Sequence, residues 1–455
     1  MEMLKKVDAT EGALLKLIFI YTIPLILSAI VQNLFHIADK AVLGNMAGTV
    51  AVASISATGT ITELIISGAI GLSTGTAIVL ARFVGQKNNE KIKATIDTSV
   101  LLGIGLGSVV AVAGFFLAPV FLAVVKCPAE CLDGALLYMR IYLAAAPANL
   151  LYNYGSSILR TLGDTQRPLI YIILSGVVNV VLNLVLCLIL PKKVAAVAIA
   201  TAVSSIISAF LVFRRLCRLE SSYRVSLRGM RFDLEALGRI VRFGIPSTVS
   251  CLVHPIGNLQ VMTAVHSYGA DVIAGFSASV SVDTIPRAFA NGFASATTTF
   301  MGQNIGAGKS DRVKRTFWYT LLINFLITGV IGLFLFGTGE FWIGLLIGRS
   351  SDVAIVTGIT RSFYVTLFMF VYAINVTLSH ALLAFGYSFI TSLTNIAFNL
   401  VFRVAWMQWV YPLKPEFETI PQCFTVSWIL NMLFCTVFFA FVYWRYVKRG
   451  VCKRI

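Results

Sequence analysis

Twelve long apolar stretches dominate this chain of 455 residues, and each is long enough to cross a lipid bilayer as a helix. A spanning helix needs about 20 predominantly apolar residues. Only 12% of the residues are charged, whereas soluble domains carry about 25%. We therefore predict an all-α integral membrane protein with twelve transmembrane helices. The stretches lie at 14–43, 50–82, 94–125, 133–159, 167–190, 194–217, 240–266, 272–301, 315–346, 354–384, 386–411 and 423–446.

The basic residues indicate which ends of these helices face the cytoplasm. Most of the 36 lysines and arginines lie near the two termini and in the loops that follow the even-numbered stretches. The positive-inside rule places these loops, and both termini, in the cytoplasm. The net charge of +16 is then explained by loops beside anionic membrane lipid. We therefore expect no nucleic-acid partner.

The two halves of the chain resemble each other. F-V-G-Q at 83–86 recurs as F-M-G-Q at 300–303, and the dipeptide I-P opens both halves, at 23–24 and at 245–246. Six predicted helices lie in each half, so the repeats run in the same sense and are related by a pseudo-two-fold axis along the membrane normal. We expect an N-terminal six-helix bundle (N-lobe), a cytoplasmic linker and a C-terminal six-helix bundle (C-lobe). Their bounds are 1–219, 220–239 and 240–455.

One acid near the end of the first stretch, Asp39, is the strongest candidate for a functional group. An ionisable side chain at membrane depth is costly and marks a functional site by default. Asn179 and Asn183 are four residues apart and project from one face of the fifth helix, and Thr201 adds a hydroxyl in the sixth. Such oxygens suit a small hard cation, or a proton on the carboxylate. We predict a cation-coupling site at these four residues, with a possible Na⁺ at the first three.

The same residues also have structural interpretations. Asp39 can reach lipid headgroups beside Lys40, and the two asparagines can form hydrogen bonds between helices. The set has no counterpart in the second half, because aligning Pro24 with Pro246 places Val261 opposite Asp39. A purely structural feature would more often be duplicated. We therefore place the ion site in the N-lobe.

Four further polar residues are candidates for lining a substrate cavity. Gln32 and His254 each lie eight residues after the proline that opens their half, so they occupy equivalent positions. Glu63 and Asp283 carry negative charge that would attract cationic substrates. Glu63 can equally pair with an arginine. For Asp283 we favour a neutralising ion pair with Arg287, one turn later in the same helix.

The chain resembles the multidrug and toxic compound extrusion (MATE) family from end to end. The resemblance rests on I-P-L-I-L-S-A-I-V-Q-N-L-F-H-I-A-D in the first stretch and on G-L-S-T-G-T with F-V-G-Q in the second. It continues with L-R-T-L-G-D-T-Q-R-P before the fifth stretch, A-I-A-T-A-V-S in the sixth and G-Q-N-I-G-A-G-K after the eighth.

The resemblance implies a V-shaped pair of six-helix bundles in a bacterial plasma (inner) membrane. It also implies cation-coupled antiport that exports amphiphilic, often cationic, organic compounds by alternating access. Family members use an aspartate in helix 1 with polar residues in helices 5 and 6, and Asp39, Asn179, Asn183 and Thr201 occupy those places. Some branches carry an acid where Asn183 stands, or a glutamate where His254 lies. This chain has neither acid, so the resemblance leaves open whether the C-lobe has a cation site of its own.

Two segments resemble motifs of enzymes or ATP-driven pumps, but neither lies in the structural context that the motif requires. G-L-S-T-G at 71–75 lies within an apolar stretch and not in a strand–turn–helix. G-Q-N-I-G-A-G-K-S at 302–310 has Gln303 where a phosphate-binding loop needs glycine. We expect no catalytic residue and no cofactor apart from Na⁺ or H⁺ as the coupling ion. We also expect a functional monomer whose partners are membrane lipid and small organic cations or amphiphiles.

The alternative within transport is a flippase for a lipid-linked oligosaccharide or another lipid-like substrate. The cavity of such a flippase should be rich in arginine. The apolar stretches contain few arginines, and these are dispersed along the sequence. They are Arg140, Arg287, Arg361 and Arg403. This distribution disfavours the flippase.

Overall fold

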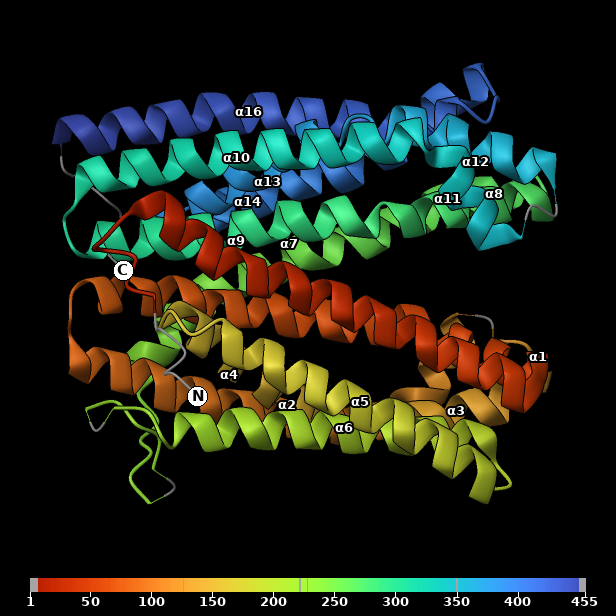
Figure 1. Cartoon of the computed structure of the whole chain (residues 1–455), viewed down its shortest axis with the longest axis horizontal. Helices are drawn as coiled ribbons and strands as arrows, with labels where there is room; N and C mark the ends of the chain where they lie inside the picture. Colours follow the sequence, from red (N-terminus) through yellow and green to blue (C-terminus); the bar gives the residue numbers. More distant parts are fainter. Residues whose placement is uncertain (1–6, 126, 221, 227, 349–350, 450–455) are drawn as a thin grey trace. The chain divides into compact units, whose positions relative to one another are not determined.

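The computed structural model of this chain consists of helices joined by short connections (Figure 1). It describes residues 7–125, 127–220, 222–226, 228–348 and 351–449. Side chains are described within these ranges except at 36, 40, 41, 43, 45, 47–50, 52, 60, 254 and 447–449. None of the described residues forms a β-strand, so the all-α prediction is confirmed.

The helices form two compact units. The first unit comprises Leu27–Thr248 together with the residues up to Asp8, and the second comprises Ala9–Ile26 and the residues from Val249 onward. The boundary thus falls inside a helix and not in the expected linker at 220–239. These units reflect packing alone, and the assignment of N-lobe, linker and C-lobe stays a prediction.

The first unit contains most of the first helix, the next five helices and the first turns of the seventh. They are α1 (Leu14–Gly85), α2 (Asn89–Val124), α3 (Ala129–Ala144), α4 (Ala146–Thr161), α5 (Gln166–Ile189), α6 (Lys193–Leu216) and α7 (Leu234–His266).

The second unit contains the rest of α7 and the helices that follow it. Two short π-helical segments, η1 (Ile396–Val401) and η2 (Trp406–Val410), flank the four residues of α15 (Phe402–Ala405). The other helices are α8 (Ala270–Val282), α9 (Thr284–Gly306), α10 (Ser310–Gly337), α11 (Gly339–Ile347), α12 (Asp352–Tyr364), α13 (Met369–Ala384), α14 (Ser388–Asn395) and α16 (Thr419–Arg449), with a 3₁₀ turn at Tyr411–Leu413.

Most of the predicted spans correspond to helices able to cross a membrane. Nine segments of the described chain are long and apolar enough, and two bent helix pairs raise the number to eleven. Helix α1 alone supplies two of them, Leu14–Asp39 and Ala53–Gly85. The stretch predicted at 272–301 is the exception, because it is divided between α8 and the more polar α9 at Asp283.

Three spans are interrupted near their middle. The pair α3 and α4 bends by 48° and the pair α12 and α13 by 46°. The first bend has a local cause, because Pro147 lies in the first turn of α4 and lacks the backbone N–H that would continue α3. The breaks before Thr284 and before Met369 place polar side chains inside the second unit.

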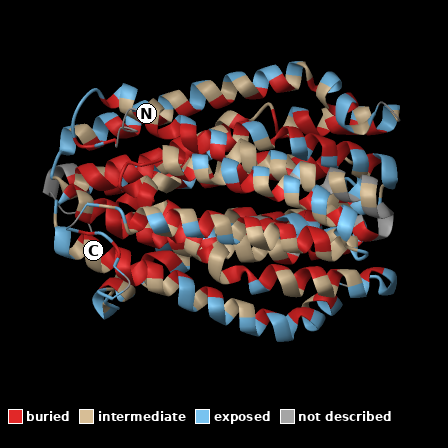
Figure 2. Ribbon diagram, turned by 60° about the horizontal axis from the view of Figure 1, so that its bottom comes forward, coloured by how far each residue is buried: buried red, intermediate tan, exposed pale blue. Residues whose placement is uncertain are grey.

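Large apolar side chains lie on the outside of the helices, which is the arrangement expected in lipid. Figure 2 shows that the long helices carry buried and exposed residues on different faces. Phe116 of α2, Leu188 of α5 and Val437 of α16 are all more than 70% exposed. Such side chains would be a liability in water, but they suit contact with hydrocarbon.

Close contact between α8 and α12 depends on a glycine. A Cβ atom placed on Gly275 would lie 2.0 Å from the backbone carbonyl oxygen of Ala354. Small residues at such crossings let two helix backbones approach closely. This contact brings α12 against α8 and so sets the position of the polar residues one to two turns further along both helices.

We expect Gly275→Ala to lower the melting temperature of the purified protein, because the added methyl group would force α8 away from α12. Overpacking of this kind costs about 1–3 kcal/mol. Gly105→Ala is the matched control, since a Cβ atom there meets nothing within 4 Å. Equal melting temperatures for the two variants would contradict the described helix contact.

Candidate functional site

The acid of α1 and the two asparagines of α5 lie together in the first unit. Asn183 donates one hydrogen bond from Nδ2 to Asp39 Oδ1 at 2.5 Å and another to Asn179 Oδ1 at 3.2 Å. Both asparagines are buried, and Asp39 is half-buried. The carboxylate therefore points toward the fifth span. The alternative in which it is remote from that span, among lipid headgroups, does not fit these contacts.

A tight contact between α1 and α5 sets this geometry. A Cβ atom on Gly176 would lie 1.8 Å from the ring of Phe35. Phe35 lies one turn before Asp39, and Gly176 lies two turns before Asn183. The packing of the Phe35 ring on Gly176 therefore fixes the position of α1 along α5. This position in turn brings the Asp39 carboxylate to the Asn183 amide.

The neighbours of the asparagines extend the polar group toward α3 and α6. Asn179 donates to Ser204 Oγ at 3.5 Å. Thr201 donates to a carbonyl of its own helix, and Tyr138 of α3 lies within hydrogen-bonding reach of Thr201 and close to Asp39. Thr201 is thus a neighbour of the site, and no hydrogen bond joins its hydroxyl to the Asp39 carboxylate among the described contacts. Sequence reasoning missed Tyr138 and Ser204; a phenol within an apolar stretch was the available signal.

One oxygen of the group has no partner. Asn183 Oδ1 is buried and accepts no hydrogen bond from any described residue. A buried acceptor left without a donor costs about 1–3 kcal/mol, so it is a natural ligand for a cation. Carboxylate, amide and hydroxyl oxygens are hard donors that fit Na⁺, and the carboxylate alone can take H⁺. Turning the Asn183 amide would bring Oδ1 toward Asp39 and let both oxygens face one cation.

The candidates for lining a substrate cavity have different surroundings. Gln32 is half-buried and Glu63 is exposed, both in α1, and Glu63 forms no ion pair with a described residue. The alternative in which Glu63 pairs with an arginine therefore has no support among the described residues. The side chain of His254 lies outside the described residues, so its equivalence with Gln32 stays a prediction.

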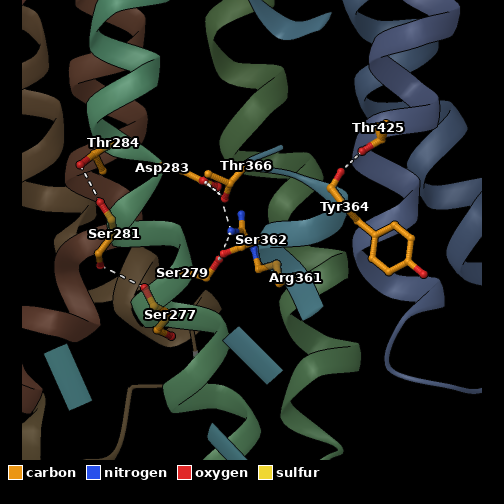
Figure 3. A network of polar contacts seen from close by, with 10 residues as sticks. All are labelled: Ser277, Ser279, Ser281, Asp283, Thr284, Arg361, Ser362, Tyr364, Thr366 and Thr425. Carbon is orange, nitrogen blue, oxygen red and sulfur yellow. Dashed lines mark hydrogen bonds and ion pairs between the residues drawn. The ribbon is translucent and has the colours of Figure 1, made fainter. Parts of the chain in front are cut away.

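Asp283 forms a buried network inside the second unit (Figure 3). Its Oδ2 accepts from Arg361 Nη1 at 2.8 Å and its Oδ1 from Thr366 Oγ1 at 2.6 Å. Arg361 also donates to Ser279 at 2.8 Å, and Ser279 is hydrogen-bonded to Ser362. The network ties the break between α8 and α9 to the break between α12 and α13.

The expected pair of Asp283 with Arg287 is wrong. Arg361 reaches the acid from α12, a neighbour that the sequence does not reveal, and the Arg287 side chain turns instead onto the rings of Tyr372 and Trp428. Because both carboxylate oxygens are occupied and the side chain is buried, this geometry does not support Asp283 as a cavity-lining residue.

Comparison with known proteins adds a family to this geometry. A family model described as MatE matches residues 24–185 and 246–406, two segments that begin at Pro24 and Pro246. The probable multidrug resistance protein YpnP of Bacillus subtilis is 29% identical over 311 residues, which cover 68% of this chain and 69% of the relative. An FAD transporter of Shewanella oneidensis is 25% identical over 296 residues, 63% of this chain and 64% of the relative.

A solved structure supports the same fold. A crystal structure of a MATE protein in complex with MaL6 matches with a TM-score of 0.90 at 21% identity, covering 98% of this chain and 99% of the other. The fold is thus the twelve-helix arrangement of two bundles that the sequence predicts. The twelfth helix is the divided pair α8 and α9, which is too polar to be counted by length and composition.

We expect Gly176→Ala to damage the ion site as well as the packing. The methyl group cannot coexist with the Phe35 ring in its present place, so α1 must shift and Asp39 must move away from Asn183. Efflux driven by an ion gradient should fall several-fold. Gly68→Ala, also in α1 and with nothing within 4 Å of the added Cβ atom, should behave as wild type. Normal efflux by Gly176→Ala would show that this contact does not position the acid.

We expect Arg361→Gln to be more destabilising than the double variant Asp283→Asn, Arg361→Gln. Removing one partner of a buried ion pair leaves an uncompensated charge and costs about 3–5 kcal/mol, whereas removing both charges is milder. Thermal melting of the two variants and of Asp283→Asn provides the double-mutant cycle. Additive losses would mean that the two side chains do not depend on each other.

Proposed function

Because this chain belongs to the MatE family, we propose that it is a cation-coupled antiporter that exports amphiphilic organic compounds by alternating access. That it is a multi-pass membrane transporter of a multidrug efflux family follows from the family and its relatives. The coupling ion and the compounds are the proposed part. The observation that carries the coupling is the contact between Asp39 and Asn183.

The coupling rests on competition for one carboxylate. The Asn183 amide and an incoming cation both need Asp39 Oδ1. When the cation binds, it replaces the amide N–H, and the partnerless carbonyl oxygen of Asn183 becomes its second ligand. One carboxylate balances one positive charge, so the site fits a single Na⁺ or H⁺. Moving one charge across 100 mV supplies about 2.3 kcal/mol, which corresponds to a roughly fiftyfold gradient of exported compound.

Helix α1 offers a route from ion binding to conformational change. Its first turns belong to the second unit, and the rest, with Asp39, belongs to the first. Pro24 lies two residues before Ile26, the last residue of the second-unit portion, and a proline inside a helix removes one backbone hydrogen bond and permits bending. A shift of α1 along α5 would therefore change the affinity of Asp39 for the cation.

The remaining properties follow from the same proposal. The transporter works as a monomer in the plasma (inner) membrane with both termini in the cytoplasm, catalyses no covalent chemistry and needs no cofactor beyond the coupling ion. The family resemblance predicts that the exported compounds are often cationic.

A flippase for a lipid-linked oligosaccharide remains the second candidate. The dispersal of the arginines along the sequence disfavoured it, but three of the four lie in the second unit, where Arg361 and Arg403 are each within electrostatic range of Arg287. Phosphate groups of such a lipid would suit this charge. Transfer of a fluorescent isoprenoid pyrophosphate across liposomes without an ion gradient would favour this candidate over the antiporter.

We expect Asp39→Asn to abolish ion-driven dye efflux from vesicles while the protein is still expressed and folded. The amide cannot balance the charge of the coupling ion. The dye is one that the wild-type protein transports, taken from a cationic rhodamine and an anionic fluorescein, and Na⁺ and H⁺ gradients are imposed separately to identify the ion. Glu130→Gln, an exposed acid in the first turn of α3, is the control. Unchanged efflux by Asp39→Asn would remove this acid from the mechanism.

A further inference from the structure

We propose that the second unit contains a binding site for an anionic group, a carboxylate or phosphate, of the exported compound, formed by Arg287, Arg403 and the indole of Trp428. The anion site itself is a property of this unit. Its role in substrate choice rests on the proposed function as an exporter.

Arg287 carries a positive charge that no described residue neutralises. It is half-buried in the first turn of α9, and its guanidinium carbon lies 5.3 Å from the ring centre of Tyr372 and 5.6 Å from that of Trp428. Asp283, one turn earlier, is already engaged by Arg361 and Thr366. Aromatic faces attract a guanidinium, but they leave its five N–H donors free for an acceptor.

Arg403 is a second positive charge with only neutral partners among the described residues. It is buried, and its three nitrogens donate to Asn258 Oδ1, Asn399 Oδ1 and Ser427 Oγ at 3.2–3.4 Å. A close approach of α7 to η1 brings these amides together, because a Cβ atom on Gly257 would lie 2.6 Å from the Asn399 carbonyl oxygen. The site therefore holds this guanidinium in a fixed orientation without neutralising it.

The local backbone around Arg403 is unusual. The arginine lies in a single α-helical turn between the π-helical segments η1 and η2. Segments of π-helix interrupt α-helices at a cost and are frequent at functional sites. Their presence on both sides of this arginine is independent of the charge argument and indicates the same place.

Aromatic rings connect the two arginines. Trp428 lies 5.2 Å from Tyr372 and 6.4 Å from Phe424, between ring centres, and Phe424 lies 4.5 Å from the Arg403 guanidinium carbon. The Trp428 side chain is buried, and its Nε1–H has no acceptor among the described residues. The Trp428 N–H and the two unneutralised guanidinium groups can all donate hydrogen bonds to the same kind of ligand, a negatively charged oxygen.

The buried charges of the second unit do not balance, and a bound anion would offset the excess positive charge. Its described interior holds three arginines, Arg287, Arg361 and Arg403, against one acid, Asp283, while its other described acids are exposed. Arg287 repels both other guanidinium groups. Unpaired charge at membrane depth is costly and marks function, and arginine binds carboxylate and phosphate in a bidentate fork.

This site predicts a substrate preference opposite to the organic cations expected from the family resemblance. A cationic amphiphile would be repelled by Arg287 and Arg403. An amphiphile with a carboxylate or phosphate head would place its charge between them and its apolar or aromatic part against Tyr372, Phe424 and Trp428.

The test is equilibrium binding of two dyes to the purified full-length protein in a neutral detergent, followed by fluorescence anisotropy. Fluorescein carries a carboxylate on the same ring system that rhodamine 6G presents as a cation. We expect fluorescein to bind the wild-type protein more tightly than rhodamine 6G. We expect Arg287→Gln to weaken its binding about tenfold or more, since a charged hydrogen-bonded partner is lost.

Three further variants separate the site from general loss of structure. Trp428→Phe keeps the ring, removes only the N–H and should weaken fluorescein binding several-fold. Arg287→Lys should restore part of the affinity lost in Arg287→Gln. Arg140→Gln is the matched control, because Arg140 is also half-buried over a ring, 4.8 Å from Phe115, but lies in the first unit. All variants must melt as single folded species for the comparison to count.

Competitors identify the source of the anion. Phosphatidylglycerol micelles that displace fluorescein point to a lipid phosphate, and octanoate or octyl phosphate that displaces it points to a free amphiphile; either supports the anion site. Equal binding of both dyes, or fluorescein binding that Arg287→Gln and Trp428→Phe leave unchanged, would overturn it. Asp39→Asn should bind fluorescein normally, so failure of ion coupling and failure of this site are distinguishable.

Discussion

The proposed ion coupling depends on a single hydrogen bond, from the Asn183 amide to the Asp39 carboxylate. A carboxylate at membrane depth is tolerated only with a partner that offsets its lost hydration. An amide offsets the lost hydration weakly, so a cation can displace it, whereas an arginine would hold the acid in a strong ion pair. The choice of asparagine therefore leaves Asp39 available to a cation, and the packing of Phe35 on Gly176 keeps the two groups in register.

The second unit shows the contrasting solution. Asp283 is paired with Arg361 and further held by Thr366, which suits a structural connection between two broken spans. Arg287 and Arg403 have no such acid among the described residues. One acid with neutral partners in the first unit and two arginines with neutral partners in the second form sites of opposite charge. An exporter that takes up a cation and releases an anionic amphiphile would use both.

The sequence predicted the features that depend on local spacing. Apolar length revealed the spans, and the i,i+4 spacing of Asn179 and Asn183 revealed a shared face. Features that depend on which helices pack together were not accessible. The predicted partner of Asp283 was wrong because its actual partner, Arg361, comes from another helix. The arginines looked dispersed because residues far apart in the sequence can lie near one another in the fold. The division of the eighth span at Asp283 was missed because its two parts read as one apolar stretch.

In the proposed mechanism, Asp39 itself takes up the coupling ion and releases the Asn183 amide. Difference infrared spectroscopy of the reconstituted protein, recorded as Na⁺ is added at fixed pH and as pH is lowered without Na⁺, observes carboxylate and amide vibrations directly. With one of the two ions, the wild-type protein should show a carboxylate band and a side-chain amide band that change together, and both changes should vanish in Asp39→Asn. The same paired change in Asp39→Asn, or no carboxylate change with either ion, would contradict the account.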